Sequence, residues 1–190
     1  MLSKGFSLAI SACLFLLFST ASAQTPDLSL SVAGVSISLE MSRGHVFQLF
    51  KAANIVTAEA QDPDQKPQYE QWVVCEQGQR DINTCNLAGS VHFADGHVSL
   101  ISARWGTKAM SAPDSALALY GAVQDFKNRG LANCKINTHD TSDQEHNYKS
   151  VTLNCGHFAY ISITNSKNLS GPSTLVIDQI ISDHDLTGLD

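Results

Sequence analysis

The stretch Val91-His92-Phe93-Ala94-Asp95-Gly96-His97-Val98 decides the predicted fold. Asp95-Gly96 separates two runs in which apolar and polar residues alternate, a pattern typical of a β-hairpin closed by a type I′ turn. The alternation continues outward on both sides, so we expect strands at 87–94 and 97–105. Because strands joined by a two-residue turn are antiparallel, this part of the chain should form an antiparallel sheet.

Strand parity divides the side chains of this hairpin between two faces, because successive residues of a strand point to opposite sides of a sheet. The apolar face, which we expect to be buried, holds Val91, Phe93, Val98 and Leu100. The opposite face takes His92, His97, Ser99, Ile101 and Trp105. Antiparallel sheets commonly face solvent on one side, so this second face is the predicted outer surface.

Upstream of the hairpin, the sequence predicts a strand, a helix and a further strand. Apolar residues alternate mostly with serine over 28–39, with a break of phase at Ala33-Gly34. Ser42 is a good N-cap, and apolar residues at i, i+3, i+4 and i+7 predict a helix over 43–53. The polar segment 57–68 contains two prolines and should be a loop, and a strand is expected at 69–76.

The same order of elements returns in the second half. Pro113 and Asp114 begin a predicted helix that ends near Gly130, and one of its faces is formed by Ala116, Leu119, Tyr120, Val123 and Phe126. Strands are expected at 133–139, 148–154, 157–164 and 174–182. Their apolar face, under the helix, holds Ile136, Val151, Leu153, Phe158 and Tyr160. Their outward face holds Lys135, Asn137, His139, Thr152, Asn154, His157 and Ile161.

A helix followed by antiparallel strands is thus expected twice, which predicts an α+β fold with helices on one face of the sheet. We interpret residues 24–110 and 111–190 as two tandem helix-plus-strands units, either separate or joined in one compact domain. Residue identity between the two halves is too low for the sequence alone to establish a repeat.

The first 23 of the 190 residues are typical of a secretion signal. Lys4 precedes an apolar run over 6–18, and Ala21-Ser22-Ala23 places small residues where a signal peptidase cleaves. The run is too short to cross a bilayer, and no other stretch is long enough for a transmembrane helix. We therefore expect a secreted or periplasmic protein that begins at Gln24 and has no integral membrane segment. Cys13 lies in a sequence resembling a lipoprotein box, but the apolar residues after it disfavour lipidation.

Charge narrows the classes of partner. The chain has 12 Lys and Arg residues against 18 Asp and Glu, and loss of Lys4 with the signal leaves 11 basic residues and a net charge of −7. Such a protein repels polyanions, which argues against nucleic acids and anionic membranes as partners. With 43% hydrophobic and 16% charged residues, the chain has enough apolar surface for a folded core that needs no cofactor.

Four cysteines remain in the mature chain, and an even number in an exported protein predicts two disulfides. If Cys134 faces Cys155 in an antiparallel hairpin, the residues that follow pair favourably: Ile136 with Leu153, Thr138 with Val151, and Asp140 with Lys149. Cys75 and Cys85 flank a polar stretch typical of a turn, so they form the other predicted bond. A zinc site made by the four thiolates is the alternative, but no pair has Cys-x-x-Cys spacing.

No specific catalytic signature is found, because the sequence has no Gly-x-Ser-x-Gly and no phosphate-binding glycine loop. The richest group of potential metal ligands lies at 138–146 and comprises His139, Asp140, Asp143, Glu145 and His146. Its spacing matches neither a zinc motif nor an EF-hand, so a polar hairpin tip is the favoured interpretation. We predict no catalytic residue and no cofactor. An exported hydrolase or metal-dependent enzyme that uses 139–146 is the alternative.

Two stretches of the first half resemble small exported domains. They are Gly34-Val35-Ser36-Ile37-Ser38-Leu39-Glu40-Met41-Ser42-Arg43-Gly44-His45-Val46 and Val91-His92-Phe93-Ala94-Asp95-Gly96-His97-Val98. A helix that opens after Met-Ser and a Phe-x-Asp-Gly hairpin are similar to the β-lactamase-inhibitor-protein type and to the small lipoproteins of the outer-membrane barrel-assembly machinery, which share that fold. The resemblance covers 34–105 and implies a binding module without catalysis. We assign none of the inhibitors' contact residues to a position of this sequence.

Together these features predict a non-catalytic protein-binding or inhibitor-like module whose partner is another exported or envelope protein. The predicted binding face is the outward one, with Trp105 as anchor beside His92, His97, His139 and His157. Histidines at these positions predict binding that depends on pH between about 5 and 8. A structural component of the envelope is the remaining alternative.

Intact-mass measurement of the exported product tests the predicted cleavage site. We expect the mass of residues 24–190 less four hydrogens, because signal peptidase cuts after Ala23 and two disulfides form. A species that starts at a lipid-modified Cys13 would contradict this prediction.

Overall fold

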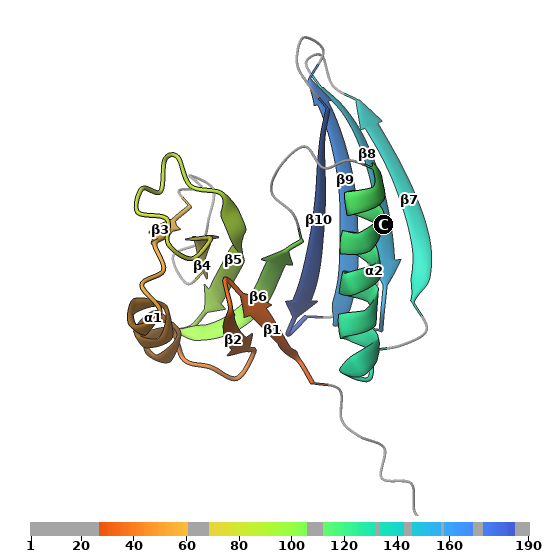
Figure 1. Cartoon of the computed structure of the whole chain (residues 1–190). Coiled ribbons are helices and arrows are strands. Elements are labelled where there is room, and N and C mark those ends of the chain that lie inside the picture. The colour runs from red at the N-terminus through yellow and green to blue at the C-terminus, as the bar shows by residue number, and fades with distance from the viewer. Residues whose placement is uncertain are drawn as a thin grey trace, which may run out of the picture.

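The computed structural model describes residues 27–60, 69–105, 112–131, 134–142, 146–156, 158–168 and 173–184. Within them, Ser29–Val32 (β1) and Val35–Ser38 (β2) form a hairpin, and eight further strands form one antiparallel sheet. These strands are Thr57–Glu59 (β3), Tyr69–Cys75 (β4), Leu87–Ala94 (β5), His97–Arg104 (β6), Lys135–Ser142 (β7), His146–Asn154 (β8), Ala159–Asn168 (β9) and Ser173–Ser182 (β10). The helices are Arg43–Ala52 (α1) and Ala112–Asn128 (α2), and the predicted α+β class is confirmed (Figure 1). Neither described helix is long and apolar enough to span a membrane.

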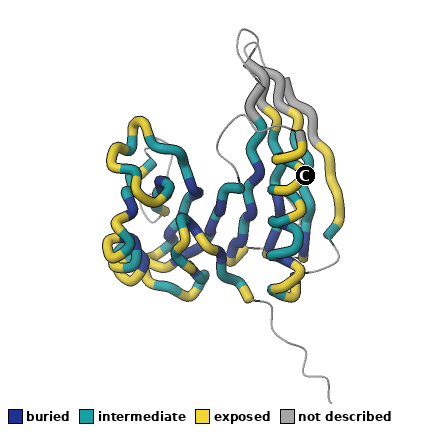
Figure 2. The backbone as a smooth tube through the Cα atoms, viewed as in Figure 1, coloured by how far each residue is buried: buried dark blue, intermediate teal, exposed yellow. Residues whose placement is uncertain are grey.

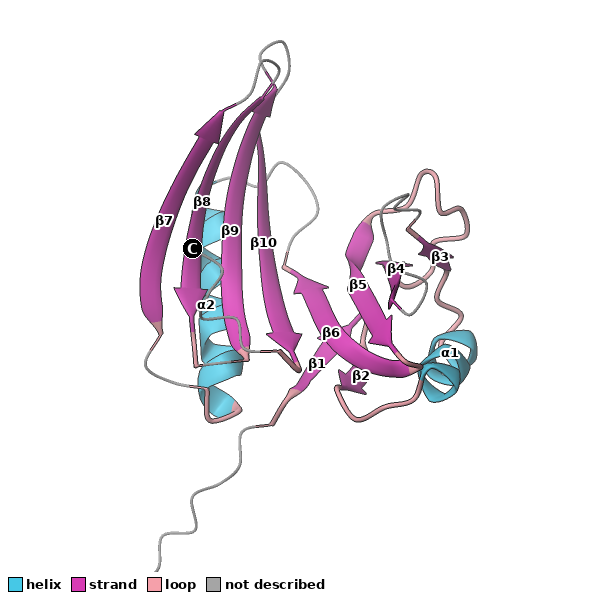
Figure 3. Ribbon diagram, turned by 180° about the vertical axis from the view of Figure 1, so that it is seen from behind, coloured by secondary structure: helices cyan, strands magenta, loops and turns pink. Residues whose placement is uncertain are grey.

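The strand order β3-β4-β5-β6-β10-β9-β8-β7 shows how the two halves meet. In each half a helix precedes four antiparallel strands, and the last strand of the first half, β6, pairs with the last strand of the second half, β10. In this pairing Ile101 lies opposite Ile181, and Ala103 lies opposite Gln179. Figures 1 and 3 show the sheet from its two sides. The halves therefore share one sheet rather than forming two.

The sheet has one covered face, which we call the inner face, and one uncovered face, the outer face. On the inner face Phe47 of α1 packs against Trp72 and Phe93, with ring centroids 4.7 and 5.8 Å apart. The β1–β2 hairpin buries Leu30, Val32 and Ile37 completely, and α2 buries Ala122 and Phe126. Figure 3 shows no helix in front of β7–β10, which is the outer side, and Figure 2 shows the buried residues concentrated where the layers meet.

The central hairpin forms as predicted, but a bulge changes its faces. Asp95 and Gly96 have φ values of 50° and 79°, which a type I′ turn requires. The register shifts after the pair of His92 with Leu100, because the next pair joins Phe93 to Val98 and leaves Ser99 as an extra residue. Beyond that point each side chain of β6 lies on the face opposite to the predicted one. Leu100 therefore shares the outer face with His92, whereas Ile101 is fully buried.

The N-terminal segment is a hairpin and not the single strand that the sequence predicts. Ala33 and Gly34, where the phase of the alternation breaks, have φ values of 52° and 83° and form the two-residue turn. Val32 and Val35 are paired across it. Downstream, β3 occupies the start of the predicted loop and pairs with β4. Residues 61–68 of that loop lie outside the described part of the chain.

In the second half the register also corrects two predicted faces. Cys155 N–H donates to the Ala159 carbonyl across the β8–β9 turn, so that Leu153 pairs with Ile161. Ile161 is consequently buried on the inner face, and Tyr160 lies on the outer face, the reverse of the prediction. The predicted faces are wrong because the sequence does not show how many residues form the turn between β8 and β9, and this number sets the face of every residue in β9.

Three apolar residues predicted to lie between α2 and the sheet are exposed instead. Ile136 is on the inner side by register but 69% exposed, because β7 is the edge strand of the sheet. Tyr120 is 65% exposed, because the buried stripe of α2 is centred on Ala122 and Phe126. Phe158, in the β8–β9 turn, is 40% exposed.

A polar cluster fixes the first helix on the sheet. The Ser42 hydroxyl accepts from the His45 amide at 3.4 Å, which confirms the predicted N-cap. Arg43 Nε and Trp72 Nε1 both donate to Glu70 Oε2, at 2.7 and 3.0 Å. These bonds, that from Trp72 foremost, hold the pKa of the Glu70 carboxyl below its ordinary value because they stabilise the carboxylate.

Both disulfides have the predicted partners. Cys75 is bonded to Cys85, ten residues away, and Cys134 to Cys155, 21 residues away. β7 and β8 pair in the predicted register, with Asp140 opposite Lys149. In the chain-entropy model, each short closed loop stabilises the folded state by about 3 kcal/mol.

Gly89 lies on β5 between β4 and β6, and we expect that no other residue can replace it without loss of stability. Its φ of 154° is rarely adopted by other residues, and a β-carbon there would overlap the Ser102 carbonyl oxygen of β6. We expect Gly89→Ala to lower the free energy of unfolding by at least about 2 kcal/mol, measured by urea denaturation. Gly44→Ala in α1 is the control, because its β-carbon meets no atom within 4 Å, and it should stay within about 1 kcal/mol of wild type. Equal stability of both variants would contradict the prediction.

Candidate functional site

The structure places the described residues of the predicted binding face on different sides of the sheet. His92 lies on the outer face, and His97 is exposed at the start of β6, with Nδ1 3.3 Å from the Asp95 carbonyl oxygen. Trp105 lies on the inner side. His139 belongs to β7 opposite Ser150, but its side chain and the whole of His157 lie outside the described part of the chain.

The predicted anchor, Trp105, is a structural residue between the layers. Its Nε1 donates to Gln179 Oε1 at 2.7 Å, and its ring packs so closely on α2 that a β-carbon at Gly121 would lie 2.6 Å from it. The prediction that Trp105 faces outward is therefore wrong. The reason is the extra residue Ser99, which reverses the faces of the rest of β6 and of the residue after it.

The centre of the outer face presents an almost uncharged surface, and the exposed Lys135 lies at its margin on the edge strand β7. The cross-strand register aligns one row of side chains across six strands: Val73, Ser90, Ser102, Ile180, Tyr160 and Asn154. A second row, from β6 to β8, contains Arg104, Asp178, Ser162 and Thr152. All ten are half-buried, so each offers part of its side chain to a ligand. The face thus combines aliphatic groups with hydroxyl and amide groups that both donate and accept hydrogen bonds.

The charges in these two rows neutralise each other. Arg104 Nε and Nη2 donate to the two carboxylate oxygens of Asp178, at 3.0 and 3.4 Å, in a bidentate pair. Burial, together with the nearby charge of Asp178, raises the pKa of the Tyr160 phenol. The phenol therefore stays neutral at physiological pH and remains both a donor and an acceptor.

Among the described side chains of the outer face, His92 is one that can respond to pH. It is half-buried between Gln71 of β4 and Leu100 of β6, and its Nε2 lies 3.3 Å from the Ser90 hydroxyl. Burial lowers the pKa of His92 below its ordinary value of 6.5, because the imidazolium form loses hydration there. The ring is therefore uncharged at neutral pH.

The predicted metal ligands lie largely outside the described part of the chain. His139 and Asp140 belong to β7 and His146 begins β8, but only their backbone is described, and Asp143 and Glu145 are not described at all. Among the side chains that are described, no three His, Cys, Asp or Glu residues are grouped so that they could hold a metal ion.

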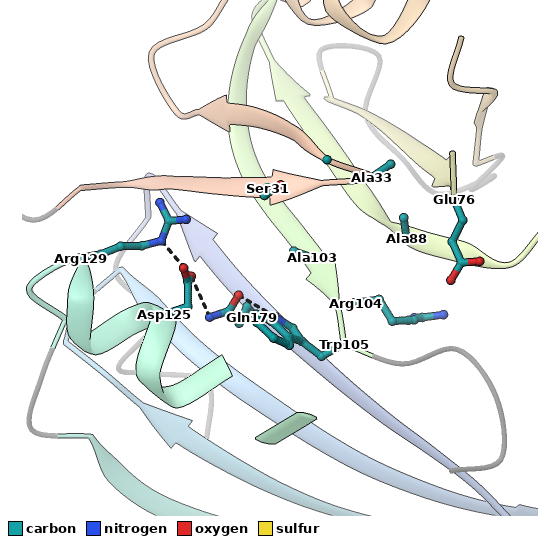
Figure 4. Close-up of a pocket in the computed structure, with 11 residues that line it drawn as sticks. Ser31, Ala33, Glu76, Ala88, Ala103, Arg104, Trp105, Asp125, Arg129 and Gln179 are labelled. Carbon is teal, nitrogen blue, oxygen red and sulfur yellow. Dashed lines mark hydrogen bonds and ion pairs between the residues drawn. The ribbon is translucent and has the colours of Figure 1, made fainter. Parts of the chain in front are cut away.

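A pocket that the sequence does not reveal lies where the two halves meet, and we call it the junction pocket. It has a volume of about 500 Å³ and lies between the tip of the β1–β2 hairpin, the end of β6 and α2. Figure 4 shows Trp105, Gln179, Asp125 and Arg129 linked in that order along one side, with Arg104 and Glu76 at the other end. Only the pairing of β6 with β10 brings these segments together, so the strand patterns in the sequence do not predict the pocket.

Comparison with known proteins identifies no relative of this chain. The chain matches no protein-family model, no curated protein sequence and no solved structure. The resemblance of residues 34–105 to exported inhibitor-type domains therefore stays a prediction.

The burial of His92 should make stability depend on pH. Below about pH 6.5 the unfolded chain protonates this imidazole while the folded protein resists, so the free energy of unfolding should fall as the pH falls. We expect His92→Gln to reduce the difference in unfolding free energy between about pH 8 and about pH 5.5, measured by urea denaturation. His97→Gln, at an exposed position, is the control. An identical pH dependence in wild type and His92→Gln would contradict the assignment.

Proposed function

We propose that this protein is a non-catalytic binding module that holds a folded protein partner on the outer face of its sheet. The observation that carries the proposal is the difference between the two faces. Two helices and a hairpin cover the inner face, whereas no described element covers the outer one. A half-buried, uncovered sheet face of this extent is available for a partner without any rearrangement of the fold.

The chemistry of the outer face favours a protein as the partner. The centres of protein interfaces are depleted of charge, and the two central rows contain only the neutralised pair of Arg104 and Asp178. Ile180 and Tyr160, side by side on β10 and β9, supply the aliphatic and aromatic groups that usually dominate binding energy.

The disulfides and the predicted signal support an exported or envelope protein as the partner. Disulfides persist in oxidising compartments, and the two bonds Cys75–Cys85 and Cys134–Cys155 are both formed. A partner in the same compartment is another exported or envelope protein. This proposal places binding on Ile180, Tyr160 and their neighbours and assigns Trp105 no direct part in it.

Site-specific photo-crosslinking in cells that export the protein tests the location of the site. A photoreactive amino acid at Ser162, in the centre of the outer face, should give a defined adduct with one protein. The same group at Ala116, exposed on α2, should not. Mass spectrometry of the adduct identifies the partner for direct binding measurements. Adducts of equal yield from both positions would contradict the proposed face.

Affinity measurements with the purified partner then test the chemistry. We expect Ile180→Glu to weaken binding at least tenfold, about 1.4 kcal/mol, because it places a charge in the neutral centre of the face. Leu117→Glu makes a comparable apolar-to-acidic change on α2, where Leu117 is 70% exposed, and should leave the affinity unchanged. Equal effects of the two substitutions would contradict the proposal.

A further inference from the structure

The junction pocket offers a second binding site that is independent of the outer face. Its volume of about 500 Å³ falls within the range of small-molecule sites. Four small residues leave this space open: Ala33 and Gly34 at the hairpin tip, Ala88 on β5 and Ala103 on β6. The indole of Trp105 lines the pocket and is held rigidly by Gln179 and by its contact with Gly121.

The charged groups of the pocket already have partners in the protein. Arg129 Nε donates to Asp125 Oδ2 at 2.8 Å, and Arg104 is paired with Asp178. Glu76 Oε2 accepts from Asn86 Nδ2 at 3.1 Å. An anion or a cation entering the pocket therefore meets no uncompensated opposite charge, so the lining favours an uncharged ligand.

The same side chains retain unused hydrogen-bonding groups. Among the interactions of the described residues, none involves Arg129 Nη2, Asp125 Oδ1 or the Ser31 hydroxyl. These groups comprise a donor from the Arg129 guanidinium, an acceptor from the Asp125 carboxylate and a hydroxyl that does both. A matching ligand must present several groups that can donate and accept without carrying charge.

We propose that the junction pocket binds an uncharged saccharide of one or two rings. Vicinal hydroxyl groups both donate and accept, so they complement planar guanidinium and carboxylate groups at once. The apolar C–H face of a sugar ring would lie against the Trp105 indole, which buries apolar surface on both sides. Gln179, whose amide is fully engaged inside the protein, positions the indole and does not contact the sugar.

Nuclear magnetic resonance of the ¹⁵N-labelled mature protein tests this proposal. The probes are glucose, N-acetylglucosamine, cellobiose and diacetylchitobiose, with diglycine and inorganic phosphate as charged comparators. We expect at least one saccharide to shift the Trp105 indole N–H resonance in a saturable manner, with a dissociation constant of about 1 mM or lower. The Trp72 indole, which is bound to Glu70 and does not line the pocket, should not shift. No saturable shift with any saccharide, or tighter binding of a comparator, would overturn the proposal.

A pair of hairpin variants locates the site. Ser31→Phe places a bulky ring at the exposed mouth of the pocket and should weaken saccharide binding at least about tenfold. Ser36→Phe introduces the same ring at the exposed cross-strand neighbour, outside the pocket, and should bind as wild type does. Thermal unfolding verifies that both variants fold. Equal affinity of the two variants would overturn the assignment, whatever the outcome at the outer face.

Discussion

The pairing of β6 with β10 is the constraint on which the rest of the structure depends. It joins the last strands of the two halves, so neither presents an open edge to solvent at the centre of the molecule. The β1–β2 hairpin packs across this joint, and its Leu30 and Val32 are fully buried there. The continuous outer face and the junction pocket both exist because the joint places the two halves side by side.

A buried amide strengthens this joint from the inner side. Gln179 on β10 is only 2% exposed, and its Oε1 accepts from Trp105 while its Nε2 donates to the Ala122 carbonyl and to Asp125. An unpaired amide in this position would cost about 1–3 kcal/mol, so the network favours one placement of α2 over the sheet. Arg129 extends the network to Asp27 and Ser29, which ties the end of α2 to the start of β1.

The two sides of the sheet consequently differ in what they can bind. The outer face is broad, nearly neutral and carries half-buried aliphatic and aromatic groups, a combination suited to a protein surface. The junction pocket is concave, has a rigid aromatic wall and is surrounded by paired charges, a combination suited to a small polar molecule. Because the layer of buried side chains separates them, substitutions at Ile180 and at Ser31 test the two sites independently.

The sequence by itself determined the features that depend on local signals. Asp95-Gly96 specified the central hairpin, Ser42 the start of α1, and the register of 134–142 against 146–155 the pairing of Cys134 with Cys155. Only the tertiary structure decided which face each side chain takes beyond Ser99, that β6 joins β10, and that Ala33-Gly34 closes a hairpin. The physical reason is that side chains alternate between the two faces of a strand, so a single bulged residue reverses the face of every later side chain. Whether a bulge forms depends on cross-strand neighbours that lie far away in the sequence.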